Sequence, residues 1–433
     1  PPAPDTRPLE GLHIAIDQNV KEYVALVGEG RFVEALEVIR RSNPFPAICG
    51  RVCSHPCEME CESGGREGPV PIRWIKRFVA DLDLDRGAPA AARVAAPRGT
   101  RIAVVGAGPA GLAAARDLAS LGHGVTVVEA MTSAGGMMRW GIPGFRLPRG
   151  LVEAECGAVL SICDEVRMGV VLGRDTSVED LFREGFSAVL VSVGAGRQAE
   201  IGLDGEPGTP GFADTIGFLA REGDETARGR RVVVVGLTRQ GFDVARLAAR
   251  GGARSVTIIG MASREAIPVD RAVVEEAEAD GGRILHGTRP VEALGRDGRL
   301  SGLAIEPGVL PAAAGAAASR AKARKLPCDL VFPAVDRYVS DVAMRGMGGV
   351  EATPWKGISA DPCTGATALP GVFAAGDAVT GPKTVVEAIA AGHRVAAAIH
   401  RRLTGEDWKH RGRPAPAGPG PEAFEVRSAG GEA

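Results

Sequence analysis

The sequence contains few aromatic residues, no long apolar run and almost no net charge. Aromatic side chains make up 4% of the 433 residues whereas glycine occurs 60 times, which favours an α/β protein with many tight turns. The formal net charge of −2 provides no basic excess for nucleic acid. Because no apolar run approaches the roughly 20 residues that cross a bilayer, we expect neither a nucleic-acid nor a membrane partner.

The start of the sequence also lacks a basic segment followed by an apolar stretch, which is the pattern of a secretory signal. Disulfides are therefore not expected, and a reducing cytoplasm is the expected location. Four of the eight cysteines crowd into the segment Cys49–Cys61. The other four are interpreted as small core or surface residues: Cys156, Cys163, Cys328 and Cys363.

Apolar residues at helical spacing predict helices within residues 12–41 and 72–82, on either side of the cysteine segment. Farther along, the pattern strand, glycine turn, helix and strand occurs twice, in residues 102–129 and again in residues 232–260. Two stretches rich in alanine are expected to be linkers, and the tail from residue 411 to be disordered. The linker stretches are residues 87–99 and 311–325.

The first of these repeats carries the glycine spacing of a dinucleotide-binding turn. The segment that follows its first strand reads Gly106, Ala107, Gly108, Pro109, Ala110 and Gly111. The first glycine makes the tight turn, the second lets the backbone approach a pyrophosphate, and the third lets helix and strand pack closely. The helix N-terminus then faces the phosphate charge. Glu129 ends the next strand, where its carboxylate can accept the ribose hydroxyls.

A second glycine–acid turn, Gly376 and Asp377, arrives from distant sequence. A helix then begins near Thr384 and Val385. Two such turns suit the long FAD molecule, because Asp377 can bond its ribityl–pyrophosphate region and the helix N-terminus can face the flavin pyrimidine oxygen. Lys383 lies beside the proposed flavin edge, where it either stabilises a reduced ring or remains a solvated loop charge.

Three segments together resemble the glutamate synthase small-subunit family of FAD oxidoreductases. They read GAGPAG at residues 106–111, GGMMRWGIPGFRLP at residues 135–148 and VFAAGDAVTGPKTVVEAIAAG at residues 372–392. The likeness runs from roughly Asn43 to Leu403. By matching motifs, the resemblance adds Gly136, Met137 and Arg146 to the FAD contacts, with an ordinary surface role as the alternative for Arg146.

The resemblance implies an α/β fold with two nested Rossmann-like dinucleotide-binding domains, of FAD and NAD(P) type, after a small α-helical cysteine-containing domain. The expected division is a helical docking domain at 1–86, an FAD domain in two parts at 98–210 and 326–408, an inserted NAD(P)-type domain at 211–325, and a disordered tail at 409–433.

In that family the inserted unit binds NAD(P)H, and this chain departs from the family's glycine triplet. Gly236, Leu237 and Thr238 stand at the triplet, so only the first glycine is kept. The side chains of Leu237 and Thr238 would crowd a pyrophosphate that lies on the backbone.

Two further departures follow the later strands of this unit. The family's Tyr-Arg-Arg becomes Gly260, Met261 and Ala262, although Arg264 is kept, and Asp336 adds a carboxylate near the phosphates. Either the unit binds NAD weakly, with NADP disfavoured by the lost arginine pair, or it is a scaffold without a nucleotide.

The cysteine segment places thiols at uniform four-residue steps: Cys49, Cys53, Cys57 and Cys61. A straight helix would spread them over about 18 Å, but Gly50 and Pro56 permit the chain to turn. Four thiolates suit a 4Fe–4S cluster or, less commonly, zinc. The segment matches the second cysteine group of the family, but no cysteine precedes Cys49. The four thiols therefore bind one cluster, or they are remnants in a helical docking domain.

No catalytic side-chain group is expected, because a flavin carries the chemistry. Histidines such as His123 and His393 are expected to have ordinary surface roles. The leading function is that of an FAD-dependent NAD(P)H oxidoreductase subunit passing electrons between NAD(H) and an iron–sulfur partner subunit of a larger complex. The alternative is an FAD-containing assembly subunit or protein-to-protein electron carrier without a working NAD site. The spacing of Cys156 and Cys163 argues against a disulfide reductase.

Overall fold

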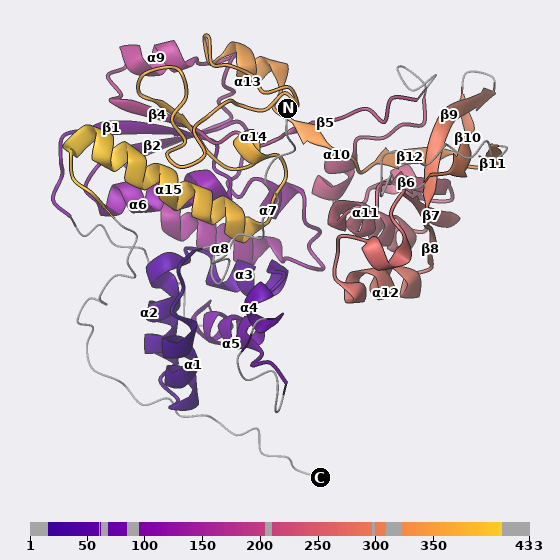
Figure 1. The fold of residues 1–433 in the computed structure, drawn as a ribbon, viewed down its shortest axis with the longest axis horizontal. Coiled ribbons are helices and arrows are strands. Elements are labelled where there is room, and N and C mark those ends of the chain that lie inside the picture. The colour runs from indigo at the N-terminus through magenta and orange to yellow at the C-terminus, as the bar shows by residue number, and fades with distance from the viewer. Residues whose placement is uncertain are drawn as a thin grey trace, which may run out of the picture.

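The structure is a computed structural model that describes residues 16–59, 61, 68–84, 95–203, 210–296, 299–308 and 323–408. The predicted tail at 409–433 lies outside the described residues, as do most of the two predicted linkers. Figure 1 shows two sheet-containing parts side by side, with the N-terminal helices packed under the first of them. Within the described residues, no helix combines the length and the apolarity needed to cross a membrane.

The first part, here called the first unit, is built on a parallel five-stranded sheet in the order β14-β4-β1-β2-β3. Its strands are β1 (Arg101–Val105), β2 (Gly124–Glu129), β3 (Glu165–Met168), β4 (Ala188–Val191) and β14 (Val372–Ala374). The central strands β1 and β4 are short apolar runs that are buried on both faces, as is usual in a parallel sheet. β14 pairs with β4 although it begins 181 residues after β4 ends, so the sheet is completed only after the inserted second unit.

Helices cover the first sheet and complete the first unit. They are α6 (Pro109–Ser120), α7 (Met137–Trp140), α8 (Arg149–Leu160), α9 (Val178–Arg183), α13 (Asp341–Arg345), α14 (Asp377–Thr380) and α15 (Val385–Thr404). α15 runs along α6, and the two helices approach closely because a side chain on Gly392 would overlap the backbone carbonyl oxygen of Ala110. The strand, turn and helix predicted at the start of this unit are confirmed as β1, the glycine turn and α6.

The second unit contains a parallel four-stranded sheet in the order β12-β6-β7-β8 and an antiparallel three-stranded sheet. Its strands are β6 (Arg231–Val235), β7 (Ser255–Ile259), β8 (Gly282–Leu285), β9 (Thr288–Arg296), β10 (Arg299–Pro307), β11 (Arg324–Leu326) and β12 (Leu330–Pro333). Its helical elements are α10 (Thr215–Ala220), η3 (Glu225–Ala227), α11 (Arg239–Arg250), η4 (Arg264–Ala266) and α12 (Arg271–Ala279). The linker expected at 311–325 is wrong at its end, because Arg324 begins β11 and pairs with β10.

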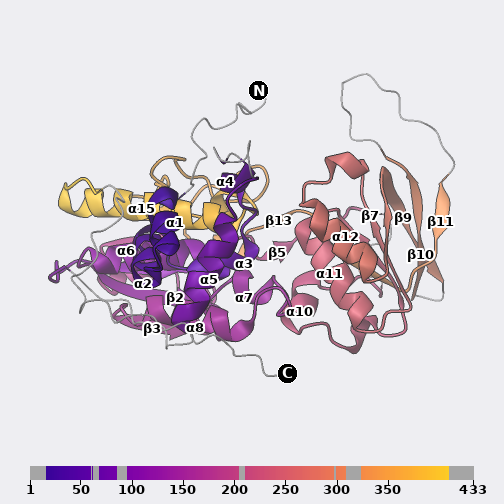
Figure 2. The same cartoon turned by 90° about the horizontal axis from the view of Figure 1, so that it is seen from below.

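The two units are joined by two crossing strands that pair with each other. These are β5 (Arg197–Gln198) and β13 (Arg337–Tyr338), which run antiparallel. Both views of the molecule place β5 at the junction, and α7 and α10 contact each other there. Figure 2 shows the second unit extending away from this junction. The predicted nesting of one dinucleotide-type fold within another is confirmed.

The N-terminal helices pack on the first unit through buried polar contacts. They are α1 (Val20–Gly28), α2 (Phe32–Ser42), α3 (Pro46–Val52), α4 (Pro56–Met59) and α5 (Ile72–Leu84). The buried carboxylate of Glu155 on α8 accepts hydrogen bonds from the backbone N–H groups of Ala47 and Ile48 at 2.8 and 3.0 Å. His393 on α15 contacts the carbonyl oxygen of Ser42 at 2.8 Å. The cysteine helices are therefore fixed to the first unit.

Candidate functional site

The first glycine turn has no room for side chains at two of its three glycines. Gly106 has a φ of +106°, and a Cβ there would overlap the carbonyl oxygen of Ser192. A Cβ on Gly111 would overlap the carbonyl oxygen of Gly106 and lie 2.5 Å from the hydroxyl of Ser192. Gly108 differs, because the nearest atom to an added Cβ is 4.0 Å away. The open side of the turn is thus at Gly108, where a pyrophosphate is expected.

The predicted acid lies at this turn. Glu129 ends β2, is buried, and accepts hydrogen bonds from the backbone N–H groups of Ala107 at 2.6 Å and Met131 at 2.8 Å. Burial raises the pKa of Glu129, while these hydrogen bonds favour its charged form. The carboxylate is therefore held at the position where the ribose hydroxyls of a dinucleotide are expected.

The segments that are distant in sequence meet at the same turn. Gly376, with a φ of +71°, lies so close to α6 that an added Cβ would be 2.9 Å from the Cβ of Ala110. An added Cβ on Gly136 would be 2.8 Å from the Cα of Gly108. Asp377 accepts a hydrogen bond from the backbone N–H of Lys383 at 3.1 Å, and burial raises its pKa to about 6. These close backbone approaches form a cradle that fits FAD.

Helix α15 begins beside this cradle. Thr384 caps the helix by accepting the N–H of Glu387 at 3.2 Å, and the Glu387 carboxylate accepts the N–H of Thr384 at 2.9 Å. Lys383 is exposed. The predicted flavin contacts of Met137, Lys383, Thr384 and Val385 stay predictions, since the structure gives only their positions.

The second unit has the same turn with one glycine replaced. A Cβ on Gly236 would overlap the carbonyl oxygen of Ala334, and a Cβ on Gly241 would overlap that of Gly236. Gly241 therefore occupies the place of Gly111, which the comparison with an adjacent glycine triplet missed. Thr238 stands where Gly108 stands in the first unit, and its hydroxyl accepts the N–H of Gly241 at 3.1 Å. Leu237 is buried against Gly260 and does not lie over the turn.

The end of β7 offers little positive charge to a nucleotide. The guanidinium of Arg264 forms two hydrogen bonds with Glu278, both at 3.0 Å, so it is already paired. Met261 and Asp336 are exposed. The predicted roles of Gly236, Leu237, Thr238 and Arg264 in holding a nucleotide stay predictions.

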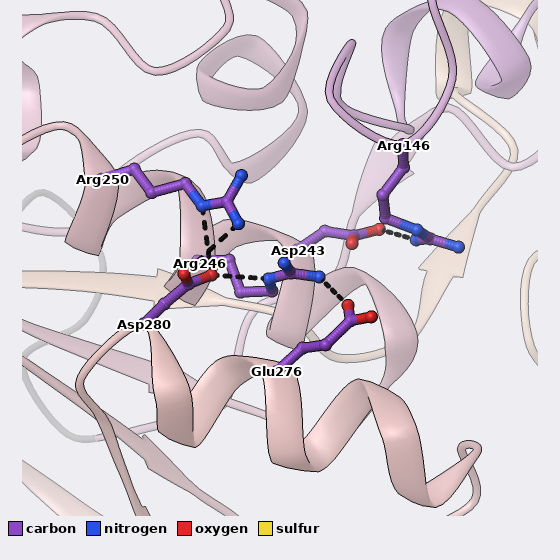
Figure 3. A network of polar contacts seen from close by, with 6 residues as sticks. All are labelled: Arg146, Asp243, Arg246, Arg250, Glu276 and Asp280. Carbon is purple, nitrogen blue, oxygen red and sulfur yellow. Dashed lines mark hydrogen bonds and ion pairs between the residues drawn. The ribbon is translucent and has the colours of Figure 1, made fainter. Parts of the chain in front are cut away.

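Arg146 forms an ion pair across the junction, and its predicted contact with FAD stays a prediction. Its guanidinium contacts the carboxylate of Asp243 on α11, and burial raises the pKa of Asp243 to about 6 despite that neighbour. Figure 3 shows this pair beside a second set, in which Asp280 accepts from Arg246 at 2.7 Å and from Arg250 at 3.1 Å. Arg246 and Arg250 also stack on Phe145 of the first unit. The segment around Arg146 therefore connects the two units.

The cysteine segment turns where proline predicts. α3 ends before Cys53, and α4 begins at Pro56. Gly50 does not make the turn. It allows α5 to approach closely, since an added Cβ on Gly50 would be 2.8 Å from the Cα of Arg77. Among the described residues, no three His, Cys, Asp or Glu side chains converge into a group that could hold a metal ion. Burial raises the pKa of Cys49 to about 12, so a bound cation would be needed to hold it as a thiolate.

Two other buried side chains interact electrostatically with the thiols. Lys76 on α5 interacts electrostatically with Cys49 and Cys57, and Tyr23 on α1 with Cys53 and Cys57. The hydroxyl of Tyr23 is buried and has no hydrogen-bond partner among the described residues. The types of these groups, namely thiols, a cation and an O–H donor, suit an iron–sulfur cluster, whose sulfur atoms accept hydrogen bonds, although the described thiols do not converge as its ligands would.

The expected surface roles of His123 and His393 are wrong, because both side chains are buried. His123 contacts Nδ1 of His400 at 2.9 Å, and His393 contacts Asp117 at 2.5 Å. His400 and His393 both lie on α15, which covers α6. These histidines tie the last helix to the first unit and lie outside the predicted cofactor turns.

Two family profiles match the chain and together cover most of it. The pyridine nucleotide-disulphide oxidoreductase profile matches residues 100–392. The profile described as dihydropyrimidine dehydrogenase domain II, 4Fe-4S cluster, matches residues 13–88. The first covers both units as far as the middle of α15, and the second contains all four clustered cysteines.

Curated relatives are about one third identical to this chain. The β subunit of an NADP(+)-dependent formate dehydrogenase of Moorella thermoacetica is 34% identical over 419 residues, covering 89% of this chain and 58% of that protein. The small chain of glutamate synthase [NADPH] of Mycobacterium tuberculosis is 33% identical, covering 89% of this chain and 84% of that protein. The chain thus spans about three fifths of the length of the formate dehydrogenase subunit.

Solved structures share the fold at lower identity. Thioredoxin reductase of T. acidophilum aligns with a TM-score of 0.55 at 20% identity, covering 70% of this chain and 98% of that one. FprA of Mycobacterium tuberculosis in complex with NADPH aligns with a TM-score of 0.57 at 18% identity, covering 71% of this chain and 85% of that one.

The resemblance to the glutamate synthase small subunit is confirmed by these matches. The cofactors of the two matching families are FAD, a nicotinamide dinucleotide and a 4Fe–4S cluster, and each corresponds to a part of the described structure. The chain belongs to the pyridine nucleotide-disulphide oxidoreductase family and is related to the small chain of glutamate synthase.

Proposed function

We propose that this chain is the flavin subunit of a larger redox complex and passes electrons between NAD(H) and an iron–sulfur partner subunit. The observation that carries the proposal is the fixed attachment of the cysteine helices to the unit that contains the FAD cradle, through Glu155 and His393. When bound, FAD exchanges a hydride with a nicotinamide and passes single electrons onward. The chain's own residues would hold this cofactor, exclude water from it and present it to the second unit.

The cysteine helices carry a surface suited to a partner. Among the described residues, four of the nine exposed large apolar side chains lie there: Val33, Met59, Trp74 and Phe78. Trp74 is 54% exposed and is flanked by the guanidinium groups of Arg73 and Arg77. Exposed tryptophan and arginine are typical of protein interfaces, which supports docking of a partner subunit at these helices.

The names of the relatives support a role as one subunit among several. They include a formate dehydrogenase β subunit, an NADPH–Fe(3+) oxidoreductase β subunit and a glutamate synthase small chain. We propose a complex of the aldehyde, 2-oxoacid or glutamate synthase type. Those names specify NADP or NADPH, whereas the neutral residues after β7 and the pairing of Arg264 with Glu278 favour NAD here.

A second candidate is a flavin subunit whose second unit is only a scaffold. It is favoured by Thr238, whose side chain replaces a glycine at the turn and uses the N–H of Gly241. Electrons would then enter and leave through protein partners. Both candidates share the FAD cradle and differ in the second unit alone.

The deciding experiment is an anaerobic titration of the purified full chain with NADH and then NADPH, with the visible absorption of bound FAD as readout. Dithionite titration of the same sample gives the total reducible flavin and serves as the control. Bleaching by stoichiometric NADH with little effect of NADPH is the expected result. If neither nucleotide reduces FAD that dithionite does reduce, the scaffold candidate replaces the proposal.

A further inference from the structure

Arg337 is a buried arginine on one of the two strands that join the units. It begins β13, where it pairs with Gln198 of β5, and only 7% of the residue is exposed. Arginine keeps its charge at neutral pH, so this position places a permanent cation inside the junction. Such a charge is costly to bury unless its N–H groups are paired.

Two of the three side-chain nitrogens of Arg337 donate to carbonyl oxygens of the chain itself. Nε donates to the carbonyl oxygen of Ala195 at 2.8 Å, and Nη2 donates to that of Gly196 at 2.5 Å. Nη1 is buried and has no hydrogen-bond partner among the described residues. Asp214 and Asp377 interact with the guanidinium electrostatically, but neither is hydrogen-bonded to it. The Nη1 nitrogen of a fixed cation, with its N–H groups, is thus left for another group.

The sheet order places this donor at the FAD cradle. Strands β14, β4 and β1 are neighbours and run parallel, so the loops that follow them lie at one edge of the sheet. Ala195 and Gly196 follow β4, the Gly106 turn follows β1, and Gly376 with Asp377 follows β14. Arg337 is therefore anchored between the two turns that form the cradle.

We propose that the unpaired Nη1 of Arg337 donates a hydrogen bond to a negatively charged oxygen of FAD and thereby links the strands of the junction to the cofactor. The oxygen belongs either to the pyrophosphate, which is charged in both redox states, or to the pyrimidine edge of the reduced flavin ring. Both are anionic acceptors that suit a guanidinium N–H. The inference rests on the flavin site of the proposed function and is independent of its nicotinamide site.

The test compares Arg337→Gln with Arg197→Gln. Arg197 lies on the partner strand β5 and is exposed, with a single hydrogen bond to the Tyr338 hydroxyl at 3.2 Å, so it is a matched control at the same junction. For each full-length variant, the dissociation constant of FAD and the midpoint potential of the bound flavin are measured. We expect at least tenfold weaker FAD binding in Arg337→Gln and little change in Arg197→Gln.

The two measurements also identify the acceptor. Weaker binding with an unchanged potential assigns the contact to the pyrophosphate, because both redox states lose it equally. A potential that falls assigns it to the reduced ring, since the lost cation stabilised only that state. FAD affinity and potential that match those of Arg197→Gln would overturn the proposal.

Arg337→Lys keeps the test decisive if the glutamine variant does not fold. A lysine cannot hold two carbonyl oxygens and reach the cofactor at once, so at least a fivefold loss of FAD affinity is expected. Unchanged affinity and potential in the lysine variant would contradict the proposal. A wild-type chain that binds FAD but is not reduced by NADH would refute the proposed function and leave this inference intact.

Discussion

The two dinucleotide-type units begin with the same turn and differ in what occupies its second glycine position. Gly108 has φ −80° and ψ −179°, and Thr238 has φ −98° and ψ 160°, so both adopt the same extended backbone. In the first unit no side chain caps the helix, whereas in the second the Thr238 hydroxyl accepts the N–H of Gly241 and donates to the carbonyl oxygen of Ala334 at 3.2 Å. The two turns therefore have the same backbone shape. In the second unit, however, the N–H of Gly241, which could donate to a phosphate, is already bonded to the Thr238 hydroxyl.

The helices that follow the two turns are also used differently. On α6 a small residue, Ala113, allows α15 to pack closely, since an added Cβ on Gly392 would be 3.0 Å from it. The corresponding position of α11 is Asp243, which pairs with Arg146 of the first unit. The first helix is covered within its own unit, and the second helix forms the contact between units. The same face of the helix is therefore buried against different partners in the two units: against α15 for α6, and against the segment around Arg146 for α11.

The largest expected effect comes from alanine at the third glycine of each turn. In Gly111→Ala the new methyl group meets backbone, so we expect a loss of about 3 kcal/mol of stability and of bound FAD. In Gly241→Ala a similar loss is expected in the second unit, with FAD retained. Urea unfolding and flavin absorbance per chain measure both. Equal loss of FAD in the two variants would show that the units do not bind independently.

The next prediction moves the side chain of the second unit into the first. Gly108→Thr is sterically allowed, because the nearest atom to the added Cβ is 4.0 Å away and φ is −80°. We expect an intact fold but at least hundredfold weaker FAD binding, or about 3 kcal/mol, since the side chain would occupy the pyrophosphate position. Flavin fluorescence quenching gives the dissociation constant, and circular dichroism controls for folding. Unchanged affinity would mean that FAD does not lie over Gly108.

The residues that sequence could identify are those whose role is set by local spacing. Gly106, Gly108, Gly111, Glu129 and the Gly376–Asp377 turn lie within short motifs, so the fold and the cradle were predictable. Gly241 also follows this spacing and was missed only because adjacent glycines were compared. The local pattern was therefore sufficient wherever backbone shape alone decided the residue.

The remaining features depend on contacts between distant segments. Arg146 meets Asp243 across 97 residues, and Arg337 meets Ala195 across 142, and neither partner is marked in the surrounding sequence. His123 follows a glycine turn, which suggests exposure, but α15 covers it from the far end of the chain. Tertiary packing determines the environments of these side chains, so the residues next to them in the sequence do not indicate what they contact.

A third prediction concerns His123, which distinguishes the two units. The corresponding residue of the second unit, which follows Gly252 as His123 follows Gly122, is Ala253. The ring of His123 contacts Thr100 at 2.5 Å and His400 at 2.9 Å, and burial lowers its pKa to about 4. The unfolded chain binds this proton more readily, so stability is complete above pH ~6.5 and is lost as pH falls towards 4, by up to about 3 kcal/mol. Urea unfolding across this range should show the loss in the wild type and a flatter profile in His123→Ala.

His123→Gln is the control for this experiment, because it keeps a polar side chain without a proton that titrates in that range. Its profile should be as flat as that of the alanine variant, although its stability at pH 8 should be higher. An acid-sensitive profile that persists in both variants would assign the effect to other groups near the turn, such as His400 or Glu406.

The smallest expected effect is a gain of function in the second unit. Thr238→Gly removes the exposed side chain and frees the N–H of Gly241, at a capping cost of only a few tenths of a kcal/mol. If the second unit binds NAD, NADH affinity should rise about tenfold, or about 1.4 kcal/mol, while NADPH gains less because no free arginine pair follows β7. Calorimetric titration measures both, with Ser177→Gly as a control for loss of a helix cap. Because Leu237 already lies inside against Gly260, no other side chain at the turn should mask this gain, and its absence would favour a scaffold.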